Sequence, residues 1–203
     1  MRSIPLKFLY KILFGLLGLS AVVTEIVVLV NANTFDPGNF FSYFTILGNI
    51  FAFIMLFVGA YVLISARKSR VIDGLRGAAT LYMVVTGIVF ATLLAGIEGA
   101  TFTAVPWDNV VLHYIMPVAL LVDWLIDRPT NRVSYKTSLL WLIVPLAYVI
   151  YTLIRGPIVQ WYPYPFLNPE PNGYGAVLVA GLGIAIVCIV GGLLLVRVSR
   201  RKS

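Results

Sequence analysis

The sequence has one cysteine, one histidine and few charged residues, and each shortage excludes a class of protein. Charged residues make up 11% of the chain and apolar residues 60%, which excludes an ordinary soluble domain. With Cys188 alone, no disulfide can form within the chain. A single histidine, His113, excludes haem ligation by two histidines, and one histidine with one cysteine does not make a zinc site. We therefore expect no metal and no cofactor.

Long apolar runs take the place of the missing charges. A helix needs about 20 apolar residues to cross a bilayer, and six runs approach or exceed that length. They cover residues 8–30, 41–65, 76–97, 109–126, 138–154 and 174–196. The runs lack the strict alternation of barrel strands, and a lipid-exposed backbone must otherwise pair within a helix. The sequence predicts an all-α membrane protein, a single domain over residues 1–203 built as a bundle of six transmembrane helices.

The basic residues behind the net charge of +7 are concentrated in alternate connections of the chain. Lys and Arg residues lie at both chain ends and in the second and fourth connections between the runs, whereas the other connections hold only Arg155. The positive-inside rule then places the N and C termini in the cytoplasm and the protein in the cell membrane. The basic excess indicates contact with anionic lipid head groups, and we expect no nucleic-acid partner.

Polar side chains from several helices are expected at one depth. Thr45 and His113 each lie about five residues inside the outer end of a predicted helix, which is roughly 7–8 Å at the rise of an α-helix. Glu25 lies at a similar depth in the first helix, and Arg155 lies at the outer end of the fifth. Ionisable residues in a membrane usually face the interior of the bundle. We therefore expect a polar cavity in the outer third of the membrane.

Arg155 is expected to form an ion pair there. The candidate carboxylates are Glu25, Glu98 and Asp108, and an unpaired charge within the membrane is costly. Such a pair would either line a ligand site or serve only the structure. The same argument predicts a structural pair between Asp123 and Arg76 near the cytoplasmic end.

The spacing of the polar residues favours one inward face. Ser42, Thr45 and Asn49 follow an i, i+3, i+7 pattern, and Asn109 precedes His113 by four residues. Simpler roles are also open: a threonine in a membrane helix commonly bonds its own i−4 carbonyl, and the histidine could form a helix–helix hydrogen bond. A hydroxyl beside a histidine is nevertheless the minimum for a nucleophile with a general base.

The segment before the last run, RGPIVQWYPYPFLNPEPNGYG, is rich in proline and aromatic residues. Its five prolines forbid a regular helix. Trp161, Tyr162, Tyr164 and Phe166 fit either an interfacial aromatic belt or a stiff lid over a cavity.

Four segments resemble a bacterial family of six-helix membrane proteins that is similar to the eukaryotic androgen-induced membrane proteins. They are FSYFTILGN, LRG with the helix that follows it, DNVVLHYIMPVALLVDW and WYPYPFLNP, and the resemblance covers most of the chain. The eukaryotic relatives are intramembrane threonine hydrolases that cleave fatty acid esters of hydroxy fatty acids. The resemblance implies that Thr45 is the nucleophile and His113 the base, with the acidic Asp123 ten residues further on.

The leading hypothesis is an integral membrane hydrolase of lipid esters, whose partners are membrane lipids and a lipid-like substrate. Thr45 would attack the ester and His113 would carry the proton. The remaining candidates bind substrate: Asn49 or Asn109 as oxyanion donor, Arg155 as the partner of a carboxylate head group, and Ser42, Glu25 and Tyr164 around the cavity. The alternatives are a non-enzymatic binder, carrier or channel for a small polar or lipid ligand, and a scaffold without a ligand site.

Overall fold

The chain is described by a computed structural model over residues 5–65, 69–98 and 101–200, and 82% of it is helical. No strand occurs in these ranges, so the all-α prediction is confirmed. The elements follow in the order α1 (Leu6–Asn31), α2 (Pro37–Phe40), α3 (Phe44–Ser65), α4 (Arg70–Val89), π-helix η1 (Phe90–Leu94), α5 (Pro106–Val110), π-helix η2 (Val111–Ile115), α6 (Met116–Ile126), α7 (Tyr135–Leu140), α8 (Ile143–Val159), 3₁₀-helix η3 (Pro165–Leu167) and α9 (Pro169–Arg200).

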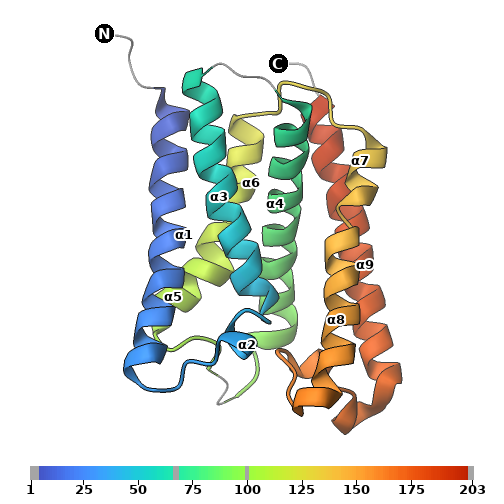
Figure 1. Cartoon of the computed structure of the whole chain (residues 1–203). Helices are drawn as coiled ribbons and strands as arrows, with labels where there is room; N and C mark the ends of the chain where they lie inside the picture. Colours follow the sequence, from blue (N-terminus) through green and yellow to red (C-terminus); the bar gives the residue numbers. More distant parts are fainter. Residues whose placement is uncertain (1–4, 66–68, 99–100, 201–203) are drawn as a thin grey trace.

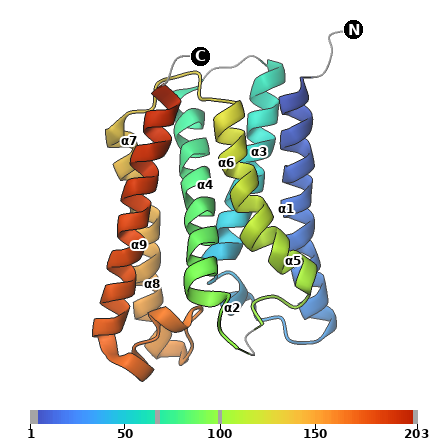
Figure 2. The ribbon, with the colours of Figure 1, turned by 180° about the vertical axis from the view of Figure 1, so that it is seen from behind.

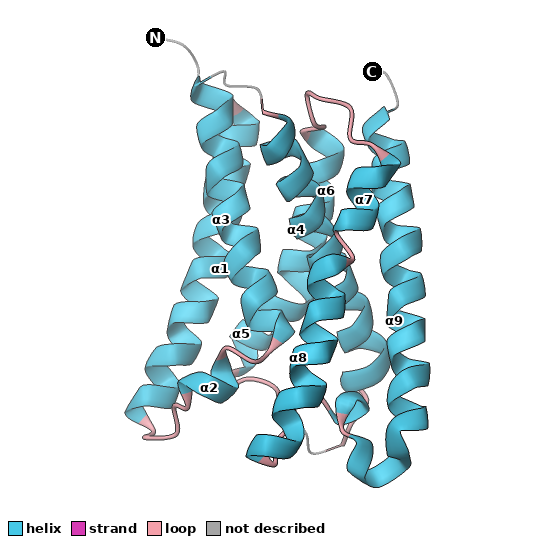
Figure 3. Cartoon of the chain, turned by 45° about the vertical axis from the view of Figure 1, so that its right-hand side comes forward, coloured by secondary structure: helices cyan, strands magenta, loops and turns pink. Residues whose placement is uncertain are grey.

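Six helical spans of the described chain are long and apolar enough to cross a membrane. They are Leu6–Asn31, Phe44–Ser65, Arg70–Leu94, Pro106–Ile126, Tyr135–Val159 and Gly173–Arg200. They run side by side, with α1 and α9 at opposite edges and α4 between them (Figures 1 and 2). The start of α1 and the end of α9 lie at one end of the bundle, called here the terminal end, and loops gather at both ends (Figure 3).

Small residues bring α1 close to its neighbours. The buried face of α1 repeats every three or four residues and includes Gly15 and Gly18. A Cβ atom at Gly15 would lie 2.6 Å from the ring of Phe57 on α3, and one at Gly18 would lie 2.6 Å from Met116 on α6. The two glycines therefore permit the close helix packing that small residues allow in membrane proteins.

Several predicted helix boundaries were wrong by a few residues. The second span begins at Phe44 rather than at residue 41, because the preceding residues form the separate turn α2, where Asp36 accepts a hydrogen bond from the N–H of Asn39 (3.1 Å). The third begins at Arg70 rather than at residue 76, because Ser69 caps it. Short polar caps set these ends, whereas the prediction followed apolar residues alone.

Two proline residues interrupt the spans that contain them. The span that contains α5 and α6 bends at η2 (Figure 2). Pro117 lies four residues after His113 and, having no N–H, cannot bond the carbonyl of His113. A second break separates α7 from α8, where Pro145 cannot bond the carbonyl of Trp141. That carbonyl instead accepts a hydrogen bond from the hydroxyl of Tyr82 on α4 (2.9 Å). The freed acceptor thus ties α7 to the centre of the bundle.

A buried network of charges joins α1, α4 and α6 near the terminal end. Arg76 bonds Asp123 (Nη2–Oδ2, 3.0 Å), which confirms the predicted pair. Lys11 is fully buried and contacts both Asp123 and Asp127, the latter at 3.0 Å. Arg76 also contacts Asp127 (3.0 Å). The place of Lys11 in this network was not predicted, because a lysine near the N-terminus is expected to be a surface charge.

Candidate active site at Thr45 and His113

Thr45 and His113 meet at the end of the bundle opposite to the terminal end. Thr45 is the second residue of α3, His113 is the middle residue of η2, and both side chains are buried. The hydroxyl oxygen of Thr45 lies 3.3 Å from Nε2 of His113. Both side chains line one cavity of about 350 Å³. The prediction that they face a common cavity within hydrogen-bonding reach is confirmed.

Thr45 differs from other threonines of the bundle in what it bonds. Thr80, Thr86 and Thr92 each donate to the carbonyl four residues earlier, at 3.0, 2.9 and 2.7 Å. Thr45 lies in the first turn of α3, so residue 41 lies outside the helix. Its hydroxyl bonds His113 and Tyr164 instead. The simpler role of a threonine that only satisfies its own helix therefore does not describe Thr45.

The hydrogen bonds of His113 fix which ring nitrogen is free. Nδ1 lies 3.1 Å from the backbone carbonyl of Asn109, which can only accept. The neutral ring therefore carries its proton on Nδ1 and presents the Nε2 lone pair to Thr45. The ring also stacks on Phe90, with centroids 3.9 Å apart. His113 and Phe90 each belong to a π-helix, an element that is frequent at functional sites.

Tyr164 completes the arrangement from the proline-rich segment. Its hydroxyl accepts a hydrogen bond from the N–H of Thr45 (3.1 Å) and lies 3.1 Å from the Thr45 hydroxyl. When Thr45 donates to His113, Tyr164 donates to Thr45. Burial raises the pKa of Tyr164 to about 12, so the phenol keeps its proton at neutral pH. Tyr164 was predicted as a substrate contact; its direct bond to the candidate nucleophile was not anticipated.

The segment that carries Tyr164 covers the cavity. Tyr164 and Leu167 are buried, and Trp161 and Tyr164 line the cavity wall. The ring of Tyr43, which precedes α3, packs edge-on against both, with centroids 5.4 Å from Trp161 and 5.7 Å from Tyr164. Of the two interpretations of this segment, the structure favours a cover over a cavity.

A second, apolar cleft of about 60 Å³ meets the polar cavity at the candidate nucleophile. Side chains from α4, η1, α8 and α9 line it, and the two hollows share only Thr45 and Tyr164 among their lining residues. Phe44 and Tyr148 also border a groove of about 1020 Å³ between α3, α4 and the α7–α8 pair. Thr45 therefore lies between a polar cavity and an apolar cleft.

Ser42 and Asn49 hold the local backbone and do not line the cavity. Ser42 lies in the turn before α3, so the predicted three-residue stripe on one helix was wrong. Its hydroxyl donates to the carbonyl of Gly38 (2.6 Å) and bonds the hydroxyl of Tyr151 (2.8 Å). Asn49 donates its amide to the carbonyls of Thr45 (2.9 Å) and Leu112 (3.2 Å). With both amide hydrogens occupied, Asn49 is not placed to serve as an oxyanion donor.

Asn109 contributes through its backbone. Its carbonyl orients His113, whereas its side chain is absent from the cavity wall and its Oδ1 is buried without a hydrogen-bond partner among the described residues. Asn109 and His113 are neighbours along the helix, as predicted, but the backbone carbonyl of Asn109 and not its side chain contacts His113.

The expected ion pair of Arg155 does not form. No ion pair joins it to Glu25, Glu98 or Asp108 in the described ranges; Arg155 donates to Oδ1 of Asn39 (2.8 Å) and lies 5.5 Å from the ring centroid of Trp161. Glu25 lines the cavity and accepts two contacts from the N–H of Ala104, at 2.8 and 2.9 Å. Shared depth did not bring the two together because α1 and α8 lie on different sides of the bundle (Figure 1).

Neither a metal centre nor a known relative accounts for this site. Within residues 5–65, 69–98 and 101–200, no three His, Cys, Asp or Glu side chains are grouped so that they could hold a metal ion. What the site offers is a hydroxyl, an imidazole with a free lone pair and a phenol. Comparisons of the chain with protein-family models, curated proteins and solved structures gave no match, so its function is argued from this geometry.

Proposed function

We propose that this protein is a multipass membrane hydrolase of lipid esters, with Thr45 as nucleophile and His113 as general base. The junction of a polar and an apolar hollow at Thr45 carries the proposal. An ester with a polar group on one side and an acyl chain on the other fits such a junction with its carbonyl at Thr45. The resemblance of the sequence to the androgen-induced membrane proteins supports the same two residues.

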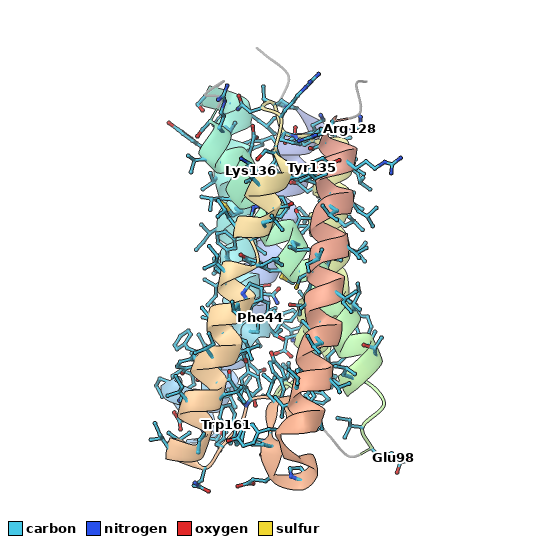
Figure 4. All side chains as sticks on the ribbon, turned by 90° about the vertical axis from the view of Figure 1, so that its right-hand side faces the viewer. Phe44, Glu98, Arg128, Tyr135, Lys136 and Trp161 are labelled. Atoms are coloured by element: carbon cyan, nitrogen blue, oxygen red, sulfur yellow. The ribbon has the colours of Figure 1, made fainter. Side chains whose placement is uncertain are left out.

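The distribution of charge supports an orientation with both termini in the cytoplasm. Arg128 and Lys136 lie at the terminal end, whereas Trp161 and Glu98 lie at the opposite end (Figure 4). Five further basic residues of the sequence pattern, Arg2, Arg67, Lys68, Arg201 and Lys202, lie outside the described residues. With the basic end in the cytoplasm, the cavity opens near the outer face of a cell membrane.

Hydrolysis of the ester takes two steps, acylation of Thr45 and release of the acyl group. The Thr45 oxygen attacks the carbonyl carbon while its proton passes to Nε2 of His113. The bond from the carbonyl carbon to the alkoxy oxygen breaks, and that oxygen takes the proton and leaves as an alcohol. A water molecule, deprotonated by His113, then attacks the acyl-threonine, and the fatty acid leaves as Thr45 regains its proton.

Tyr164 is the donor best placed for the oxyanion. Its hydroxyl lies 3.1 Å from the atom that will bond the carbonyl carbon, and it keeps its proton. A donor aimed at the developing negative charge lowers the barrier more in a site closed to water than in solution. Tyr164 thus takes the role of oxyanion donor that was predicted for Asn49 or Asn109.

A binder or carrier without hydrolysis is the second candidate, and one observation favours it. His113 is oriented by a neutral carbonyl rather than by a carboxylate, so no negative charge stabilises an imidazolium at Nδ1. In this function Thr45, His113 and Tyr164 only bond a ligand.

Covalent labelling separates the two candidates. We expect a lipid-like phosphonate to modify purified wild-type protein at Thr45, located by peptide mass spectrometry. The matched control is Thr80→Ala, which removes a buried threonine that bonds its own helix. Labelling that persists in Thr45→Ala would overturn the hydrolase proposal, and so would a wild-type protein that is neither labelled nor active on any lipid ester.

A further inference from the structure

The wall of the polar cavity is acidic and aromatic. Glu25 and Asp36 contribute carboxylates, and no Lys or Arg among the described residues lines it. Five aromatic side chains line it: Phe40, Tyr43, Phe102, Trp161 and Tyr164. Carboxylates with aromatic faces are the groups that bind ammonium ions, through charge and through cation–π attraction. We infer that the cavity receives the ammonium head group of a cationic lipid ester, an inference that rests on the proposed hydrolase function.

No basic side chain of the described residues offsets the negative charge near Glu25. Glu25 is 6% exposed and lies within hydrogen-bonding reach of Asp108, which is fully buried. The two Asp108 oxygens meet no N–H or O–H donor, and neither carboxylate forms an ion pair with a basic side chain in the described chain. Two buried carboxyl groups held together favour either a shared proton or a bound cation. A ligand ammonium supplies that cation.

Arg155 is a basic side chain that contacts residues of this wall, and its position favours the same conclusion. It lies behind two lining residues, bonding Asn39 and facing the ring of Trp161, but does not itself line the cavity. A carboxylate head group, the predicted partner of Arg155, would face Glu25 and Asp36 without a basic side chain in the described wall. The repulsion of like charges therefore disfavours an anionic ester.

The geometry divides such a substrate in two. The ammonium group occupies the cavity beside Glu25, and the acyl chain enters the apolar cleft beyond Tyr164. The ester carbonyl then lies at Thr45, between them. Choline-type and ethanolamine-type esters share this chemistry.

The test compares three dodecanoate esters on purified protein. One has choline as its alcohol, one has 3,3-dimethylbutanol, in which carbon replaces nitrogen at the same shape, and one has 3-hydroxypropanoate, which is anionic. We expect kcat/KM for the choline ester to exceed that of its neutral isostere by at least about tenfold, the scale of a desolvated cation–π contact. Equal rates for the two, or a preference for the anionic ester, would overturn the inference and leave the hydrolase proposal standing.

Two variants test whether Glu25 causes the preference for the choline ester. Glu25→Gln is expected to bring the choline-to-isostere ratio close to one, whereas Glu98→Gln keeps it, because Glu98 is exposed and does not line the cavity. An unchanged ratio in a folded Glu25→Gln protein would refute the role of Glu25. The wild-type comparison stands if Glu25→Gln does not fold.

A binding measurement separates the failure of this inference from the failure of hydrolysis. Phenyltrimethylammonium is expected to raise the Tm of the wild type, of Thr45→Ala and of Glu98→Gln, and its uncharged isostere tert-butylbenzene to raise it less. If no ester is hydrolysed but this difference appears, the ammonium site holds and the hydrolase proposal falls. If the two compounds act alike, the ammonium site is wrong.

Discussion

At the scale of residues, the site consists of a few short contacts between groups that lie far apart in the sequence. Thr45, His113 and Tyr164 come from α3, η2 and the segment between α8 and α9. The first two could be predicted because topology gives depth and a polar residue in a membrane helix usually faces inward. Tyr164 lies in a segment without regular structure, where neither depth nor periodicity indicates the direction of a side chain.

The first prediction concerns the two catalytic candidates. Thr45→Ala and His113→Ala are each expected to reduce lipid-ester turnover at least about a thousandfold, because the nucleophile and its base act as one unit. The double variant should be little worse than the worse single one. Steady-state hydrolysis checks this, with circular dichroism as a test of folding, and Thr45→Ser is expected to keep part of the activity.

Thr80→Ala serves as the control for that series, since Thr80 is a buried threonine in the middle of α4 that does not line the cavity. Its turnover should stay near that of the wild type. Activity near wild type in both Thr45→Ala and His113→Ala would instead favour the binder.

The second prediction concerns the phenol. Tyr164→Phe keeps the ring, which stacks on Phe166 with centroids 5.2 Å apart, and removes only the hydroxyl. We expect kcat to fall about a hundredfold, the typical loss for one oxyanion donor. Tyr162→Phe, in the same segment but outside the cavity wall, is the matched control and should leave kcat unchanged. A Tyr164→Phe protein with undiminished kcat would assign the oxyanion to another donor.

At the scale of elements, local exceptions to regular helix shape the site. The predicted spans followed apolar runs, and they located the helices but not the π-helices or the start of α3. Pro117 and Pro145 lie at two of the breaks, because proline has no N–H to bond the carbonyl four residues earlier. The π-helix at Phe90 has no such mark in the sequence, since Phe90–Leu94 contains neither proline nor glycine.

The third prediction tests the contact between α1 and α3. Gly15→Ala places a methyl group 2.6 Å from the ring of Phe57, so the ring or the helices must shift. We expect a loss of about 1–3 kcal/mol in unfolding free energy, as for other overpacked sites. Gly181→Ala on α9 is the control, because a Cβ there meets no atom within 4 Å and alanine favours helix. Denaturation in detergent measures both, and equal stabilities would contradict the close packing.

The fourth prediction follows from the charges that join α1, α4 and α6. Burial alone would raise the pKa of Asp127, but the charges of Lys11 and Arg76 outweigh it and hold the pKa below its ordinary value of 3.8. A depressed pKa contributes stability above that ordinary value, and this stability is lost as the pH falls through the lower, folded-state pKa. The Tm should therefore drop below about pH 4.

Asp127→Asn removes that titration. We expect this variant to be less stable than the wild type at neutral pH and the difference between them to narrow in acid. A difference that stays constant from pH 7 to pH 3 would show that Asp127 does not contribute through its charge.

At the scale of the whole molecule, composition determined the number and kind of helices but not their neighbours. Six spans and an all-helical fold followed from apolar runs and the need to pair the backbone. The prediction of an ion pair between Glu25 and Arg155 was wrong, because the depth of a residue gives its position along the bundle but not which helices are its neighbours. Which helices lie side by side depends on packing details, such as Gly15 against Phe57, that carry no periodic signal.

The fifth prediction concerns orientation. Cysteines introduced by Gln160→Cys and Lys136→Cys lie at exposed positions at opposite ends of the bundle. A Cys188→Ala background removes the native thiol, which is buried. In intact cells, a membrane-impermeant maleimide should label position 160, and position 136 only after the cells are opened. The reverse pattern would invert the proposed topology and place the cavity at the cytoplasmic face.

The buried Lys11 has a consequence for biosynthesis. Its partner Asp123 lies 112 residues later in the chain, so α1 leaves the ribosome long before the carboxylate exists. Until α6 arrives, the lysine must extend its amine to the nearby head-group region, as long basic side chains do at helix ends. The final docking of α1 is therefore expected to be a late event that follows insertion of the fourth span. A nascent chain released before Asp123 would expose in α1 a charge that nothing in the shorter chain neutralises, which is the kind of signal by which membrane quality control recognises an unfinished protein.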